Sequence, residues 1–490
     1  MIHNTNPHRF VTIAILVMAI VMMAHEAAHA FTVDNIEFRK ISNSTVTVVK
    51  GTYSGDMVIP ETIEYEGTTY TVTEISDYAF DSMGGLTSIS LPNSIERIGT
   101  GAFNSCVLLS SIEIPDKVTS IEMEAFYNCS GLKTVRFPVS LQSIGDYSFY
   151  DCKRLNDLEF PSTLKSIGDY AFTNCEYLTE IELPDGCDQI GTYVFAYCSS
   201  LSEAKLPASI PDVGNNLFMG CTSLSEIVIP EKVTVIYPNA FYGCTRLSSV
   251  DIQGPVTSIH TGVFDGCTYL ESITLPETLE SIGDAAFRRS NLMEITIPGN
   301  VKSIGYACFD RCPQLENVIF ADGEESLELG EMAMGRLKAT SLYLGRDLTY
   351  TSDEYGSTPF YNCTGLVDIT IGNNVTDATA LFGSRYTKLA KLSSNAIDPP
   401  VMRPFSEDLY KSVEVTVPQE SIEKYHTAEV WKEFVKMNAT VGMDCIEVVD
   451  DSSIIVYDIN GHEIKPEQMK DGAVYLVKQG ASVKKVIGSK

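Results

Sequence analysis

Histidine is scarce in this sequence, and the spacing motifs of common catalytic sites are missing from most of it. Of seven histidines, only His260, His426 and His462 lie beyond the first 30 residues, and they are far apart in the chain. Beyond residue 30 there is no HExxH, GxSxG, P-loop or GxGxxG motif, which hydrolases and nucleotide-binding enzymes use. No CxxC pair indicates zinc. The sequence therefore predicts no enzyme, cofactor or metal site.

Positive charge is also in short supply. The chain has 35 Lys and Arg against 64 Asp and Glu, for a formal net charge of −29. Nucleic acid and anionic membranes are disfavoured as partners, because their phosphates must be neutralised by Lys and Arg. An acidic surface keeps a long chain in solution, and it can also steer basic partners toward it.

Long hydrophobic runs are absent except near the start. Residues 10–24 are apolar and follow Arg9, but the run is shorter than the ~20 residues of a membrane span. Ala28-His29-Ala30 has the small-x-small pattern of a cleavage site. We expect residues 1–30 to be a signal peptide cut between Ala30 and Phe31, and the mature chain to be exported without a membrane span.

A phenylalanine recurs every 23 residues over most of the chain. The positions are Phe80, Phe103, Phe126, Phe149, Phe172, Phe195, Phe218, Phe241, Phe264 and Phe287, with Phe309 one residue early. Self-similarity at such a period indicates a solenoid, in which each unit stacks on its neighbours to bury a continuous core.

One repeat, residues 167–184, reads IGDYAFTNCEYLTEIELP. Ala171, Phe172 and Cys175 are spaced as on one face of a short helical turn. In the strand that follows, alternation points Ile181 and Leu183 inward and the intervening glutamates outward. At the corner before the turn, Gly168 is expected to use its freedom at positive φ.

This frame resembles the BspA-like leucine-rich repeats of the Bacteroidetes, whose pattern is LxxIxIPxxVxxIGxxAFxxC. The resemblance implies a leucine-rich repeat solenoid, β-rich with short helical turns, a β-hairpin N-terminal cap, an α/β C-terminal cap and a small β C-terminal module. It also implies a cell-surface or secreted protein that adheres to a host matrix protein or a bacterial surface protein. The expected divisions are a signal peptide at 1–30, a β cap at 31–71, repeats at 72–392, a capping unit at 393–441 and a sorting-like module at 442–490.

Eight of the thirteen cysteines occupy one repeat position: Cys106, Cys129, Cys152, Cys175, Cys198, Cys221, Cys244 and Cys267. In stacked coils their side chains run parallel, which suits a disulfide poorly. We expect a ladder of reduced, buried thiols packed as small hydrophobes.

Outward strand positions in the middle coils gather acidic residues with one opposing charge, Lys205. These residues, here called the acidic grid, are Asp157, Glu159, Glu180, Glu182, Glu203 and Glu226. Like charges stacked this closely repel unless a partner neutralises them. The grid is either a solvated face or the contact face for a basic partner.

Tyrosines form a second column, two residues before the repeat phenylalanine, at Tyr147, Tyr170 and Tyr193. Tyrosine rows offer rigid contact area for proteins or sugars, and they also simply stack along solenoids. The main hypothesis is thus a non-catalytic protein-binding repeat protein, and the alternative is a glycan-binding protein that uses these rows.

Overall fold

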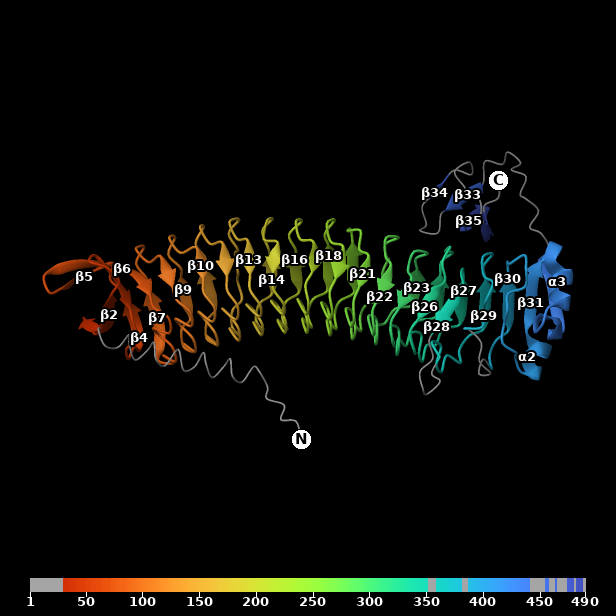
Figure 1. The fold of residues 1–490 in the computed structure, drawn as a ribbon, viewed down its shortest axis with the longest axis horizontal. Helices are drawn as coiled ribbons and strands as arrows, with labels where there is room; N and C mark the ends of the chain where they lie inside the picture. The colour runs from red at the N-terminus through yellow and green to blue at the C-terminus, as the bar shows by residue number, and fades with distance from the viewer. Residues whose placement is uncertain are drawn as a thin grey trace, which may run out of the picture.

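The computed structural model describes residues 30–350, 358–380 and 387–440, and the backbone of four strands between 454 and 487. Its coils stack along one long axis (Figure 1), with a β-sheet at the N-terminal end and short helices at the other. This is the β-solenoid of stacked repeats that the 23-residue period predicts. The expected signal segment lies outside the described residues, except that Ala30 is exposed and Phe31 begins the first strand.

One face of the solenoid carries the predicted strands, which we call the long-strand ladder. Its neighbouring strands pair in parallel, and Thr134 of one coil aligns with Ser111 of the coil before it. Its strands are β4 Gly55–Val58, β7 Leu86–Ser90, β9 Ser111–Glu113, β11 Thr134–Arg136, β14 Glu180–Glu182, β16 Glu203–Lys205, β18 Glu226–Ile229, β20 Ser249–Ile252, β23 Glu294–Ile297, β25 Asn317–Phe320, β27 Ser341–Leu344, β29 Asp368–Ile371 and β30 Lys391–Ser394. In two coils, residues 156–160 and 271–275, no strand is assigned.

A second ladder, which the sequence did not predict, runs along the opposite side of each coil. Most of its strands are only two residues long and end in an isoleucine or valine, directly before the position that glycine occupies in most repeats. We call it the short-strand ladder: β8 Arg97–Ile98, β10 Ser120–Ile121, β12 Ser143–Ile144, β13 Ser166–Ile167, β15 Gln189–Ile190, β17 Asp212–Val213, β19 Val235–Ile236, β21 Ser258–Ile259, β22 Ser281–Ile282, β24 Ser303–Ile304, β26 Leu327–Leu329 and β28 Leu348–Tyr350. Each strand alternates a half-exposed residue with a buried one in most coils, so both ladders contribute side chains to the core.

The connection between the two ladders consists of single tight turns rather than a continuing helix. In the coil of Phe172, Tyr170 and Asn174 have φ of 58° and 61°, in the left-handed region. The amides of these residues and of Phe172 bond to carbonyls of the next coil at 2.9 Å. The left-handed residues thus direct backbone N–H groups along the solenoid axis to the next coil, whereas an α-helix would bond these groups to its own carbonyls.

Gly168 has a different role from the one its position suggested. Its φ is not positive, and the left-handed conformation falls on Tyr170 instead. A Cβ on Gly168 would lie 2.6 Å from the backbone nitrogen of Asp146 in the preceding coil. The glycine is therefore required because two coils approach closely at this corner, and the expectation of positive φ was wrong.

The core is a set of parallel side-chain ladders. Rings of the repeat phenylalanines, from Phe80 to Phe309, are buried and stacked with centroids 5.0–5.9 Å apart. The eight expected cysteines are likewise buried and unpaired, which confirms the interior ladder. Each thiol has a backbone acceptor, as in Cys152, whose Sγ lies 3.2 Å from the carbonyl oxygen of Phe126. Cysteine thus fills the position as a hydrophobe that can also donate a hydrogen bond.

Distinct elements cover the two ends. At the N-terminal end, β1 Phe31–Val33, β2 Ile36–Lys40, β3 Thr45–Val48, β5 Thr62–Tyr65 and β6 Thr68–Ile75 form a mixed sheet that β8 extends. At the other end the parallel long-strand ladder runs beyond Leu392 into β31 Glu414–Pro418 and β32 Lys436–Thr440. The helical elements there are α2 Glu407–Ser412, η2 Gln419–Ser421, α3 Ile422–Thr427 and η3 Trp431–Glu433.

In the capping unit, the apolar spacing of Ile422, Tyr425, Trp431 and Phe434 predicts one amphipathic helix, but the structure interrupts it. Val430, with φ 71°, separates α3 from η3. Trp431 is fully buried and its Nε1 donates to the carbonyl oxygen of Pro400 at 2.8 Å, so it anchors this end of the core. Further on, β33 Ile454–Tyr457, β34 Glu463–Ile464, β35 Val474–Gln479 and β36 Ser482–Ile487 pair as an antiparallel sheet. None of the helices in the described part of the chain is long and apolar enough to cross a membrane.

Candidate binding surfaces

The members of the acidic grid all lie exposed on the long-strand ladder or its continuation. Parallel pairing of β14 with β16 sets Glu180 directly opposite Glu203. Asp157 bridges Thr134 without a strand of its own, and Glu226 lies opposite Ser249 in β20. The structure thus brings one like-charged pair into register, which is destabilising when it is directly opposed.

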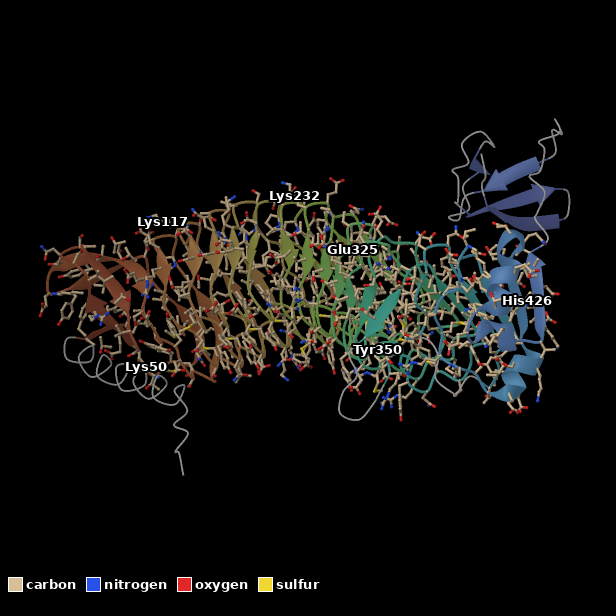
Figure 2. The ribbon with its side chains drawn as sticks, turned by 45° about the vertical axis from the view of Figure 1, so that its right-hand side comes forward. Lys50, Lys117, Lys232, Glu325, Tyr350 and His426 are labelled. Carbon is tan, nitrogen blue, oxygen red and sulfur yellow. The ribbon has the colours of Figure 1, made fainter. Side chains whose placement is uncertain are left out.

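Two of the outward charges on this ladder are neutralised within the chain. The Lys205 ammonium pairs with Glu182, and the Arg136 guanidinium pairs with Glu113. Exposed pairs of this kind contribute little stability, because water screens them. The remaining grid residues have no ion pair among the described residues: Asp157, Glu159, Glu180, Glu203 and Glu226. Figure 2 shows side chains projecting along the whole array, with Lys117 and Lys232 on one edge and Lys50 on the other.

The tyrosine column stacks ring on ring. Tyr147 and Tyr170 have centroids 4.8 Å apart, and Tyr170 and Tyr193 are 4.7 Å apart, with planes within 7° of parallel. All three side chains are half-buried, and each has positive φ. Because these rings cover one another's faces, only their edges and the outer face at each end of the stack are accessible to a ligand. Sugars bind aromatic residues through ring faces, so this row offers a sugar little.

An open groove lies on the short-strand ladder in the later coils. Its volume is about 480 Å³, and it is bounded by β21, β22, β24 and β26. Its lining includes three glycines, Gly283, Gly305 and Gly330. Polar groups in the lining come from His260, Asp284 and Tyr306. No pattern in the sequence predicts this groove, because the groove depends on a ladder of two-residue strands.

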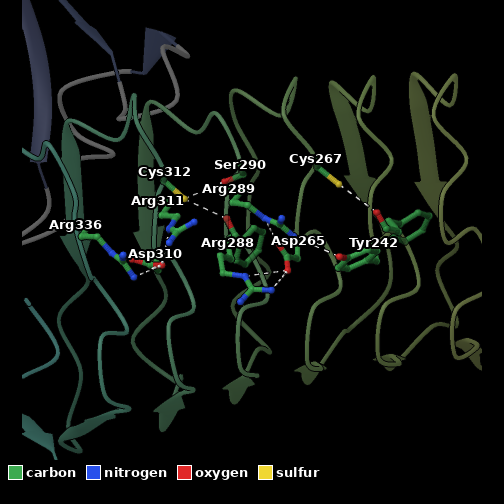
Figure 3. A network of polar contacts seen from close by, with 12 residues as sticks. Tyr242, Asp265, Cys267, Arg288, Arg289, Ser290, Asp310, Arg311, Cys312 and Arg336 are labelled. Atoms are coloured by element: carbon green, nitrogen blue, oxygen red, sulfur yellow. Dashed lines mark hydrogen bonds and ion pairs between the residues drawn. The ribbon is translucent and has the colours of Figure 1, made fainter. Parts of the chain in front are cut away.

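A cluster of four arginines lies on the turns beside this groove (Figure 3). Arg288 and Arg289 bind the carboxylate of Asp265, with Nη2 of Arg288 2.5 Å from Oδ2 and Nε of Arg289 2.9 Å from Oδ1. Their hydrogen bonds to this buried carboxylate raise the pKa of both guanidinium groups. The sequence signal was present in the shortened loop at Arg289, where the 23-residue period slips.

A second buried carboxylate, that of Asp310, holds the other two arginines. Arg336 donates from Nε to Oδ1 at 2.8 Å and from Nη2 to Oδ2 at 3.1 Å, in a bidentate geometry. Arg311 is looser, with its Nε 3.7 Å from Oδ2. Among the described residues, no group of three or more His, Cys, Asp or Glu is placed to hold a metal ion.

Comparison with known proteins agrees with this architecture. The family model for the BspA type leucine rich repeat region matches in six copies, over overlapping segments from residue 73 to 395. No curated protein matches the chain.

Several solved structures are similar in fold. A leucine-rich repeat protein from Bacteroides ovatus is 22% identical, with 84% of this chain and 99% of that chain covered and a TM-score of 0.49. A leucine rich cell surface protein from Faecalibacterium prausnitzii is 25% identical, with 74% and 94% covered and a TM-score of 0.44. The pneumococcal vaccine antigen PcpA is 19% identical, with 84% and 96% covered and a TM-score of 0.40. Because the family model spans more than half of the sequence, the chain belongs to the family of BspA-type leucine-rich repeat proteins.

Proposed function

We propose that this chain is an exported, non-catalytic binding protein that recognises a basic surface of a protein partner through the acidic grid. The partner class is a host matrix protein or a protein of another bacterial surface. The observation that carries the proposal is the set of exposed grid carboxylates without an ion pair among the described residues, with Glu180 and Glu203 directly opposed. A basic partner would relieve that repulsion and gain steered association.

Family membership and the N-terminal sequence also support this proposal. Leucine-rich repeat solenoids present long open surfaces, which suit contact with macromolecules. The apolar segment at residues 10–24 and the cleavage pattern at Ala30 fit export. A similar protein from Faecalibacterium prausnitzii carries the description of a cell surface protein. We propose that this chain also acts at the cell surface or outside the cell.

The alternative, glycan binding through the tyrosine row, has less support because Tyr147, Tyr170 and Tyr193 stack on one another. The two functions differ in their response to salt. Recognition of a basic protein by exposed carboxylates weakens as ionic strength rises. Binding of a neutral polysaccharide changes little.

The test compares charge reversal on the grid with charge reversal elsewhere. After a panel of host matrix proteins and glycans has identified a ligand, binding kinetics are measured for wild type and for Glu180→Lys/Glu203→Lys. Glu182 is left unchanged because it pairs with Lys205. The control, Glu231→Lys/Glu277→Lys, makes the same change in charge on exposed loop residues without an ion pair among the described residues.

We expect the grid variant to slow association about tenfold at low salt and the control to have a much smaller effect. Both should unfold within about 0.5 kcal/mol of wild type, because exposed substitutions change stability little. Equal association rates for the two variants would show that the grid is only a solvated surface. Salt-insensitive binding to a polysaccharide alone would favour the alternative.

A further inference from the structure

One column of the repeat changes character abruptly in the later coils. The residue two positions after the repeat phenylalanine has positive φ in every coil, a conformation that glycine and asparagine tolerate best. Up to Gly266 the column reads Ser82, Ser105, Asn128, Asp151, Asn174, Tyr197, Gly220, Gly243 and Gly266. In the next three coils the same turn position holds Arg289, Arg311 and Arg336, with φ of 63°, 60° and 57°. Arg336 follows Met334, which takes the place of the repeat phenylalanine.

The turn itself does not require these arginines. Nine preceding coils form the same turn mostly with small or polar residues, and a long side chain at positive φ costs backbone energy that glycine or asparagine avoids. Arginine is also rare in this chain, whose net charge is −29. Three arginines in successive coils, with Arg288 beside them, therefore need an explanation other than folding.

Two buried carboxylates hold these arginines in place. The side chains of Asp265 and Asp310 are only 1% and 5% exposed. Asp265 accepts hydrogen bonds from both Arg288 and Arg289, whereas Asp310 accepts from Arg336 and forms a looser ion pair with Arg311 at 3.7 Å. The four arginines carry four positive charges against two negative ones, which leaves two net positive charges at this surface. Because the carboxylates lie beneath the guanidinium groups, the outer surface of the cluster is cationic.

The guanidinium groups retain donors. Arg288, Arg289 and Arg336 each donate from Nε and Nη2 to carboxylate or tyrosine oxygens, and Nη1 of each has no partner among the described residues. Arg311 is the freest of the four, with a side chain 61% exposed and one contact, at 3.7 Å. All four line a hollow of about 270 Å³.

We propose that this hollow binds a single oxyanion group, a phosphate or sulfate, either as the free ion or as the monoester of a small ligand. Planar guanidinium groups with free N–H donors match the oxygens of such anions, in bidentate contacts that lysine cannot make. The volume accommodates a group of this size together with some water. This site is separate from the acidic grid, so the proposal does not depend on the proposed function.

The charge of the whole chain and the neighbouring groove restrict which anionic ligands fit this hollow. A chain with a net charge of −29 repels an extended polyanion, so the cluster suits an isolated oxyanion group rather than a charged polymer. Tyr306 lines both this hollow and the groove on the short-strand ladder. The body of an esterified ligand can therefore extend past Tyr306 into the groove, while its oxyanion remains on the arginines.

The test uses Arg311→Asn, since asparagine occupies the same column at Asn128 and Asn174 and tolerates the conformation. The matched control is Arg154→Asn, which removes the same charge at an exposed residue several coils away. Calorimetric titration of the purified protein with inorganic phosphate, inorganic sulfate, glucose 6-phosphate and N-acetylglucosamine 6-sulfate is performed at fixed ionic strength. Glucose serves as the uncharged control ligand, and thermal unfolding is recorded for each variant.

We expect saturable binding at one site per chain to at least one anionic probe, and no binding of glucose. Arg311→Asn should weaken it about tenfold or more, because a charge-assisted contact is lost, without lowering the melting temperature. Arg154→Asn should leave binding unchanged. Arg289→Asn gives a second variant, in which Asp265 keeps Arg288 as its partner.

The anionic probes distinguish the two sources of the group. Tighter binding of an ester than of the inorganic ions identifies a ligand whose body occupies the groove, and equal or tighter binding of the inorganic ions identifies a free anion. The proposal is overturned if none of the anionic probes binds below about 10 mM. It is also overturned if Arg311→Asn and Arg289→Asn bind the probes as wild type does.

Discussion

Replacing Phe172 with alanine should be among the most damaging single changes to this solenoid. The ring is completely buried, stacks on Phe149 at 5.2 Å and on Phe195 at 5.6 Å, and meets the edge of Phe160 at 5.7 Å. Truncation of a buried phenylalanine costs ~3–5 kcal/mol. We expect the upper end of that range, because flat stacking between two rigid coils leaves the cavity little room to collapse.

Tyr170, two residues earlier, provides the comparison within the same turn. Its ring is half-buried and contacts Tyr147 and Tyr193, so Tyr170→Ala should cost about 1–2 kcal/mol from lost stacking. That is more than a fully exposed residue would cost and clearly less than Phe172→Ala.

Urea unfolding followed by circular dichroism gives both stability changes. Solenoids are stabilised mainly between neighbouring repeats, so hydrogen exchange of the flanking coils should be measured alongside. Faster exchange in the Phe172→Ala variant is expected first in the coils of Phe149 and Phe195. Equal losses for the two variants would refute the assignment of Phe172 to the interior and Tyr170 to the turn surface.

Two further predictions concern the thiol ladder and the tight corner. Burial raises the pKa of Cys106 and Cys244 to about 12, whereas unfolded thiols ionise near ~8.5, so the folded state holds more protons between these values. The free energy of unfolding should therefore fall above about pH 9, by up to ~1.4 kcal/mol per thiol per pH unit, and native protein at pH 8 should resist alkylation until it is denatured. Mass spectrometry that finds Cys152 joined to Cys175 under non-reducing conditions would contradict the reduced ladder. Gly168→Ala should lower the free energy of unfolding by ~1–3 kcal/mol, because the new Cβ would press on the backbone of Asp146. Gly55→Ala has open space around it and should cost only ~1 kcal/mol, the penalty of placing a Cβ at positive φ. Similar melting temperatures for the two variants would show that the coils can separate at this corner.

The inward positions of the fold could be predicted from the sequence because they are repeated. Phe172, Cys175 and Ile181 recur at a fixed period, and a pattern repeated about eleven times identifies a buried column more securely than any single segment does. The short-strand ladder could not be predicted in this way. A strand of two residues, such as Ser166–Ile167, is too short to show alternation, and its pairing comes from the stacking of coils rather than from local preference.

Backbone conformation was harder to predict than burial. Positive φ is usually assigned to glycine, yet here Tyr170 adopts it and Gly168 does not. The neighbouring coil imposes that conformation, since it supplies the acceptors that satisfy the amides of the turn. At the C-terminal end the apolar spacing of Ile422, Tyr425 and Trp431 predicts one helix, but the left-handed Val430 divides it.

For the candidate sites, the sequence predicts which residues share a face but not which of them contact one another. The sequence placed Glu180, Glu182 and Glu203 on one face, but only the register revealed that Glu180 opposes Glu203 while Glu182 pairs with Lys205. Arg289 and Arg311 could have been found by tabulating the residue two positions after each repeat phenylalanine, whereas Arg336 follows Met334 and escapes that table. The carboxylates of Asp265 and Asp310 beneath the arginines are buried, and a repeat alignment does not show which guanidinium groups they hold.

The two proposed sites also differ in what the solenoid must supply. An acidic grid needs only regular strands, because the outward positions of any coil are free to carry charge. The arginine cluster needs turns that tolerate long side chains at positive φ, and these turns are held by bonds to the next coil, such as that from the Arg289 amide to the carbonyl of Asp310 at 3.1 Å. Stability in a repeat array is shared among neighbouring interfaces, so the regular coils from Phe80 to Phe264 can support a few strained ones. The 23-residue period first slips after Phe287, in the coil of Arg289. Features that stacking does not require, such as the arginine cluster, therefore begin where the repeat becomes irregular.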